Sequence, residues 1–341
     1  MMEVPEHLPP DGSGQPSPTE TTPESAPSLI PVPEQFPSFD TYPSQIPFHA
    51  TGAAQQTQEL QSPDVFTRIL PPRERIPHIG HVVILTLLAL CSLFASALVA
   101  RLGVHYHLFG VKDLTQAASE IHFTLGTEGI FYLLTLFASL LIFPLVWHKG
   151  LLTGLQWRGS VAVQHIGYLI AAAAVCFGLA LLSGLIMPGP PDAPIDKIFR
   201  APGAAWILFA FGVTFAPFFE ELAFRGFLLP ALCTAFDWIA EKFHHQPAPA
   251  LDFYDHPQWS MPAMAVAAVI TSILFALLHA DQTGYSIGPF LLLICVSLVL
   301  CAARLILRSV AASIVVHACY NFLLFSVMFL GTSGFKHLEN M

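Results

Sequence analysis

Long uncharged runs dominate the pattern of apolar and polar positions from residue 82 onward, and a single run, the fourth, carries a few charges near its middle. The runs occupy residues 82–100, 129–147, 163–187, 201–236, 256–280, 282–303 and 309–335. At about 1.5 Å of rise per residue, each is long enough to cross a hydrocarbon core of about 30 Å as a helix. None shows the alternation with polar residues that membrane-spanning β-strands need. We therefore predict an all-α fold, a polytopic transmembrane bundle of about seven to eight helices, with residues 103–123 in the membrane interface.

The first 72 residues have a different composition. They hold 15 of the 29 prolines, nine acidic residues and one basic residue, Arg68, and so carry −8 of the net charge of −9. Such a segment has too few apolar residues to form a core, and it lacks the basic start and apolar run of a signal peptide. We predict a disordered, Pro-rich acidic tail over 1–72, N-terminal transmembrane helices over 73–200, and a second transmembrane region over 201–335.

Charged residues are scarce outside this tail, and this scarcity argues against a soluble protein. Only 11% of the chain is charged, against about 25% in ordinary soluble domains, so a soluble globular enzyme is excluded. The acidic tail argues against nucleic-acid binding, which needs basic residues to meet phosphates. The six cysteines all fall in the predicted helices without C-x-x-C spacing, and we interpret them as packing residues.

Lys and Arg in the loops predict the orientation, because cytoplasmic loops carry an excess of them. With the N-terminus inside, eight basic residues fall on the cytoplasmic side and five on the other. The cytoplasmic set is Arg68, Arg73, Arg75, Lys149, Arg158, Lys242, Arg304 and Arg308, and the other set is Arg101, Lys112, Lys197, Arg200 and Lys336. We predict a cytoplasmic N-terminus, with Arg304 and Arg308 in a cytoplasmic turn.

The charges of the fourth run form the first candidate site, because an ionisable residue inside a membrane helix costs several kcal/mol and is a functional candidate by default. Glu221 and Arg225 are four residues apart, share a helix face and can neutralise each other. Glu220 points about 100° away and lacks that cation. A desolvated carboxylate without a cation suits a general base. The alternative is a structural ion pair where the helix leaves the membrane.

Two further polar groups interrupt the later runs. His279 follows Phe275 by one helical turn near the end of one run, and His317 and Asn321 project from one face of the last. His317 lies nine residues after Arg308, which is about 13 Å into the bilayer at helical rise. The structural alternatives are a helix-end histidine at 279 and interhelical hydrogen bonds from the other two. Together, however, a carboxylate pair, two histidines and an amide suffice to hydrolyse an amide bond without a covalent intermediate.

In this order on membrane helices, the E-E-x-x-x-R, F-x-x-x-H and H-x-x-x-N motifs resemble the CPBP family. That family comprises the type II CAAX prenyl endopeptidases and bacterial relatives implicated in bacteriocin processing or self-immunity. The matching positions are Glu220, Glu221, Arg225, Phe275, His279, His317 and Asn321. The resemblance covers about residues 201–330 and makes 201–335 the catalytic core. It implies an integral protein of a bacterial plasma (inner) membrane that cleaves a membrane-associated peptide or protein, lipidated or not.

By the same resemblance, Glu220 and His279 would activate the attacking water, and His317 and Asn321 would stabilise the oxyanion. Glu221, tied to Arg225, would shape the site, and Phe275 would support it. The family was once treated as zinc-dependent, and Glu220, His279 and His317 are chemically able to bind zinc. The H-E-x-x-H motif is absent, and we favour hydrolysis without a metal or other cofactor.

Three alternatives remain open from sequence: a zinc-dependent version of the same protease, a non-catalytic scaffold or immunity protein, and a proton-relay transporter. Geometry also sets a condition. With simple spans, Glu220 and His279 lie toward opposite faces of the membrane. They meet only if the first helix is long and tilted, running to about residue 235, or if the second breaks near Asp281.

Two weaker candidates lie outside these motifs. The loop 237–259 holds five possible metal ligands: His244, His245, Asp252, Asp255 and His256. We interpret it as a solvated loop. Glu128 stands just before the second run, and we interpret it as an interfacial charge.

Overall fold

The computed structural model describes residues 75–336, except 191–193, 195–198, 200–202 and 253–255. These residues belong to the second of two units, Leu70–Met341. The tail predicted over 1–72 lies outside the described residues.

Seven helices among the described residues are long and apolar enough to cross a membrane. They are Ile79–His105 (α3), Ile121–Trp147 (α5), Ile166–Ile186 (α8), the composite helix Ala204–His244, Met261–Leu278 (α13), Ile287–Leu307 (α14) and Val310–Gly331 (α15). Short helices lie between some of them: Leu108–Gly110 (η1), Leu114–Ser119 (α4), Leu151–Gly154 (α6) and Gly159–Gln164 (α7). The described residues form no β-strand, only an isolated bridge between Leu251 and Pro257. The prediction of an all-α, polytopic transmembrane fold is confirmed.

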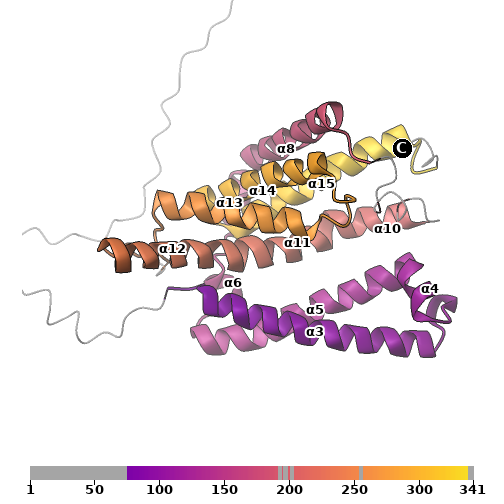
Figure 1. Ribbon diagram of the computed structural model, residues 1–341, viewed down its shortest axis with the longest axis horizontal. Coiled ribbons are helices and arrows are strands. Elements are labelled where there is room, and N and C mark those ends of the chain that lie inside the picture. The colour runs from indigo at the N-terminus through magenta and orange to yellow at the C-terminus, as the bar shows by residue number, and fades with distance from the viewer. Residues whose placement is uncertain (1–74, 191–193, 195–198, 200–202, 253–255, 337–341) are drawn as a thin grey trace, which may run out of the picture. The chain divides into compact units, whose positions relative to one another are not determined.

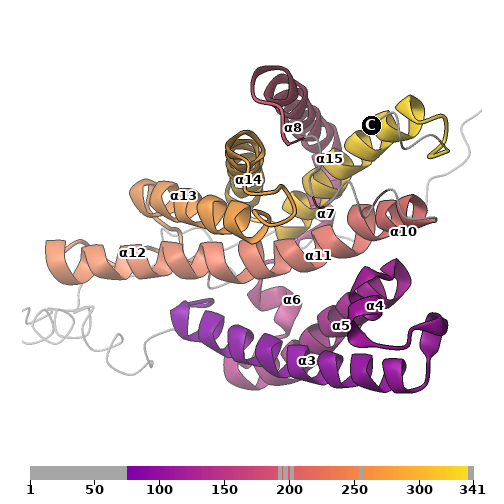
Figure 2. The ribbon, with the colours of Figure 1, turned by 45° about the vertical axis from the view of Figure 1, so that its right-hand side comes forward.

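The composite helix runs between two groups of helices. On one side α3 and α5 pack against each other, and on the other lie α13, α14, α15 and α8 (Figures 1 and 2). Apolar side chains fill the space between α8, α14 and α15, where Ala173, Leu300 and Val316 are fully buried. This packing fixes α15, the helix that carries His317, against its neighbours.

Two π-helical turns divide the composite helix. α10 (Ala204–Ala210) leads into η2 (Phe211–Phe215), then α11 (Ala216–Glu221), η3 (Leu222–Leu228) and α12 (Leu229–His244). A π turn holds one more residue than an α turn, so the side chains that follow it are rotated by about 100°. The glutamate pair ends α11 and therefore lies between two such rotations.

The turn between α12 and α13 is held by side chains from both helices. Asp237 in α12 accepts hydrogen bonds from the Ser260 hydroxyl at 2.6 Å and the Ser260 amide at 3.2 Å. The Trp259 indole donates to the Thr234 hydroxyl at 3.1 Å. Ser260 is the N-cap of α13, so these contacts fix the start of the helix that ends at His279.

Gly288, the second residue of α14, lies so close to the end of α8 that it has no room for a side chain. A Cβ at this position would overlap the Met187 carbonyl oxygen and lie 2.9 Å from the Met187 Cβ. We expect Gly288→Ala to lower the free energy of unfolding by about 1–3 kcal/mol, because overpacking forces backbone shifts. Thermal unfolding of the purified protein in detergent measures the effect.

Gly178→Ala in α8 is the matched control, since a Cβ there meets nothing within 4 Å. It should unfold at the wild-type temperature or slightly above, because alanine favours helix over glycine. Equal unfolding temperatures for the two variants would contradict the close approach at Gly288.

Candidate active site

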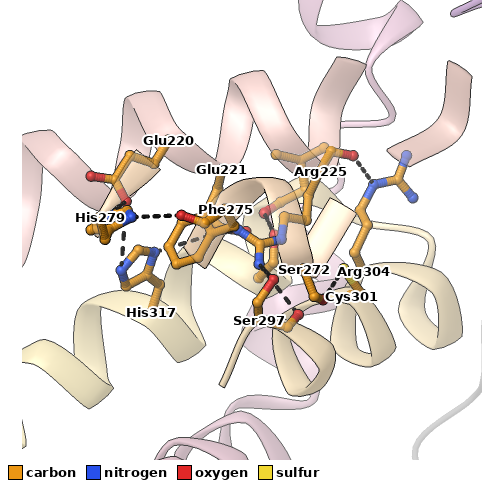
Figure 3. A network of polar contacts seen from close by, with 12 residues as sticks. Glu220, Glu221, Arg225, Ser272, Phe275, His279, Ser297, Cys301, Arg304 and His317 are labelled. Atoms are coloured by element: carbon orange, nitrogen blue, oxygen red, sulfur yellow. Dashed lines mark hydrogen bonds and ion pairs between the residues drawn. The ribbon is translucent and has the colours of Figure 1, made fainter. Parts of the chain in front are cut away.

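Glu220 lies between two histidines contributed by other helices (Figure 3). Its Oε2 atom is 3.7 Å from Nε2 of His279, which caps the end of α13, and 3.9 Å from Nε2 of His317 in α15. The Glu220 and His279 side chains are about one-fifth exposed, at 19% and 20%. Three of the four residues predicted to be catalytic therefore meet at one partly accessible point.

Glu220 and His279 can meet because the composite helix is long, as the predicted spans required. It continues to His244, well past residue 235, and α13 ends at Leu278. The glutamate pair therefore lies deep within one long helix, level with the end of α13. A plain 20-residue span would have separated Glu220 from His279.

The hydrogen bonds at Nδ1 assign the proton of each histidine. His279 Nδ1 lies 2.8 Å from the Phe275 carbonyl oxygen, which can only accept, so Nδ1 carries the proton. His317 Nδ1 lies 3.0 Å from Glu221 Oε1, and we assign its Nδ1 proton to that carboxylate. In their neutral forms both rings consequently turn an Nε2 lone pair toward Glu220.

Behind this point lies a fully buried ion pair. Arg225 donates to Glu221 Oε1 at 2.7 Å, and both side chains are 0% exposed. The same guanidinium donates to the Ser297 hydroxyl at 2.7 Å and to the Ser297 carbonyl at 3.2 Å. Burying two ions costs several kcal/mol each unless they are paired and hydrogen-bonded, and these contacts supply that pairing.

Phe275 packs against Arg225 of the buried pair and against both histidines. Its ring is 2% exposed. It lies 4.6 Å from the Arg225 guanidinium carbon, 4.5 Å from the His279 ring centre and 5.9 Å from that of His317. The ring therefore supports both imidazoles and adds a cation–π contact to Arg225.

Asn321 lies one helical turn beyond His317 and takes part in a different contact. Its side-chain amide donates to the Gly212 carbonyl in η2 at 2.7 Å. One of its two N–H groups is thus engaged with backbone, and the other remains for a second partner.

Arg304 corrects one of our predictions. It was expected in a cytoplasmic turn, but it lies in the last turn of α14 and is 1% exposed. Its Nε atom donates to the Arg225 carbonyl at 3.0 Å, and its terminal nitrogen lies 3.5 Å from the Leu155 carbonyl. Arg308 alone lies at the turn, 3.5 Å from Asp252.

Glu128 also differs from its predicted place. It lies seven residues inside α5 rather than before it, and lines a groove of about 360 Å³ together with Leu93, Ala117 and Phe131. One turn further on, the Tyr132 ring stacks on Phe219 with centroids 4.7 Å apart and planes 9° from parallel. Tyr132 belongs to none of the sequence motifs, although its four-residue spacing places it on the same helix face as Glu128.

The loop that follows α12 is solvent-exposed at residues 245–248, as the solvated interpretation expects, whereas Asp252 farther along it forms an ion pair. Asp252 lies 3.3 Å from Arg158 and accepts a hydrogen bond from the His256 amide at 2.9 Å. His256 is 3% exposed, and its burial lowers the pKa of the imidazole. Asp255 lies outside the described residues.

Across the part of the chain that the structure describes, no three His, Cys, Asp or Glu side chains are grouped closely enough to hold a metal ion. Glu220, His279 and His317 nevertheless have the donor types that zinc binds.

Over residues 202–323, the chain matches the family model described as type II CAAX prenyl endopeptidase Rce1-like. The matched range includes all seven motif residues, so the resemblance to CPBP-family intramembrane proteases is confirmed. Comparisons with curated proteins and with solved structures found no match.

We expect Glu221→Gln to destabilise the protein by about 3–5 kcal/mol, because it leaves the Arg225 cation buried without its counter-charge. Chemical or thermal unfolding in detergent measures the loss. Glu241→Gln is the control: Glu241 pairs with Arg75 where both side chains are about one-fifth exposed, at 18% and 22%, and an ion pair in contact with solvent contributes about 1 kcal/mol or less. Similar losses for both variants would contradict the role of the buried pair.

Proposed function

We propose that this protein is an intramembrane endopeptidase that hydrolyses a peptide bond of a membrane-associated substrate, using a water activated by Glu220 and His279. The observation that carries the proposal is the position of Glu220 Oε2, 3.7 Å and 3.9 Å from the Nε2 atoms of two histidines inside a membrane-helical bundle. The family match over 202–323 supports it.

The spacing and the proton assignment suit water activation. A separation of 3.7 Å between Glu220 and His279 is too long for a direct hydrogen bond. Both atoms are acceptors when His279 is neutral, so one water between them can donate a hydrogen to each. Its oxygen lone pair is then directed at the substrate carbonyl carbon. Glu220 takes one proton as the C–O bond forms and returns it to the leaving nitrogen as the C–N bond breaks.

The oxyanion that forms needs donors on the opposite side of the carbonyl. The free N–H of Asn321 is one. His317 is the other, because a doubly protonated imidazole donates from Nε2 while its Nδ1 stays bonded to Glu221. The surrounding apolar helices exclude bulk water and strengthen each of these contacts.

We assign the substrate to peptides that reach the bilayer, whether by a lipid group or by their own apolar residues. We keep the cytoplasmic N-terminus and the bacterial plasma membrane as parts of the proposal, on the basis of the Lys and Arg distribution and the family resemblance.

Removing either member of the activating pair should abolish cleavage. In proteoliposomes with a quenched fluorescent peptide ending in a farnesylated CAAX sequence, we expect Glu220→Gln and His279→Ala to lower kcat by about 10²–10⁴-fold. His317→Ala should lower it by about 10²–10³-fold, as loss of an oxyanion donor does. His244→Ala, at the far end of α12, is the control and should cleave as wild type does.

The same peptide carrying a hexadecyl thioether, and one without lipid, tests the substrate class. Wild-type cleavage by all three site variants would overturn the catalytic assignment of Glu220, His279 and His317. Failure of the wild-type protein to cleave any of the three peptides would instead favour a non-catalytic scaffold or immunity protein.

Metal removal provides an independent test. Because the proposed step uses a carboxylate and imidazoles as acid and base, we expect full activity after treatment with EDTA and 1,10-phenanthroline, and less than one equivalent of zinc per chain by mass spectrometry. Loss of activity that returns on adding zinc would instead establish the zinc-dependent version of the enzyme.

A further inference from the structure

Each π turn of the composite helix is followed by a proline at the position where the next backbone donor is needed. The Ala216 amide bonds the Phe211 carbonyl, and the Leu229 amide bonds the Phe224 carbonyl, both five residues back. In that register, the next amide would be directed to the carbonyl of Gly212 or Arg225. The next residues are Pro217 and Pro230, which have no N–H to donate.

A side chain from another helix supplies the missing donor in both places. Asn321 of α15 donates to the Gly212 carbonyl at 2.7 Å, and Arg304 of α14 donates to the Arg225 carbonyl at 3.0 Å. Figure 3 shows the Arg304 guanidinium pointing at this carbonyl. The two contacts lie on either side of the glutamate pair.

Arg304 has no acidic partner to explain its burial. It is 1% exposed, and no carboxylate of the described residues lies within ion-pair distance of it. The strong hydrogen bond it makes goes to a carbonyl oxygen of η3, and a weaker one at 3.5 Å goes to Leu155. The hydrogen-bond partners of this buried guanidinium are therefore backbone carbonyls.

We propose that Arg304 is a positioning residue of the active site: it replaces the donor missing at Pro230, holds η3 as a π turn and thereby fixes the direction of Glu220 and Glu221. Relaxation of η3 to an α turn would rotate α11 relative to α12 by about 100°. Glu220 would then turn away from His279. This inference rests on the proposed function for its catalytic readout, although the contact itself can be tested without it.

The kinetic test uses the full chain in proteoliposomes with the farnesylated peptide. We expect Arg304→Gln to lower kcat by about 10–100-fold with KM unchanged, because only the fraction of molecules that keeps η3 as a π turn, about 1–10%, still directs Glu220 at His279. Arg304→Lys should recover part of the rate, since one N–H donor can still reach the Arg225 carbonyl. Arg308→Gln, four residues later on the same side of the bundle, should leave both constants unchanged.

A second-site change separates positioning from general stabilisation. Pro230→Ala restores a backbone N–H opposite the Arg225 carbonyl, so the double variant Pro230→Ala/Arg304→Gln should regain most of the lost kcat. A folded Arg304→Gln protein with wild-type kcat, or a double variant as slow as Arg304→Gln alone, would overturn the proposal.

Amide hydrogen exchange tests the positioning role of Arg304 separately from the proposed protease function. If the wild-type protein cleaves no probe, the proposed function fails, but the amides of residues 222–229 still report on the contact. They should exchange faster in Arg304→Gln than in Arg308→Gln. Equal exchange in these two variants would overturn the positioning role whatever the activity.

Discussion

The ion pair between Glu221 and Arg225 is the interaction on which the described core depends. Both charges are fully buried, and inside an apolar bundle neither is tolerated alone. The two charges are compensated by hydrogen bonds to Ser297 of α14 and His317 of α15 and by a cation–π contact with Phe275 of α13. One buried pair in the composite helix therefore determines how three other helices must be placed. The partly exposed Glu220, one residue away, is positioned by the same arrangement.

Much of this arrangement is readable from the sequence. The uncharged runs predict the spanning helices because a membrane permits few unpaired charges. The same scarcity makes Glu220, His279 and His317 conspicuous, and the structure brings them together. Four-residue spacing predicts the Glu221–Arg225 contact correctly because it spans only one turn.

Other features are not readable in this way, for physical reasons. Helical spacing assumes about 100° per residue, and the two π turns break that assumption on both sides of the glutamate pair. A charge near the end of an apolar run suggests a solvated turn, but the partner of Arg304 is a backbone carbonyl, which the pattern of apolar and polar residues does not reveal. The contact of Asn321 with Gly212 is hidden for the same reason, since its partner is also a backbone carbonyl of the composite helix. Prolines 217 and 230 were the available sign, since each leaves a carbonyl without its donor.

The anchoring of α13 at its N-cap, Ser260, makes the length of this helix important for the position of His279. Ser260 is tied to Asp237 at one end, and His279 stands at the other. A single residue added or removed between them would move the imidazole by about 1.5 Å and rotate it by about 100°. The number of residues from Ser260 to His279 therefore determines where the imidazole lies. Among homologous chains, we expect this number to vary less than the length of the loop that precedes Ser260.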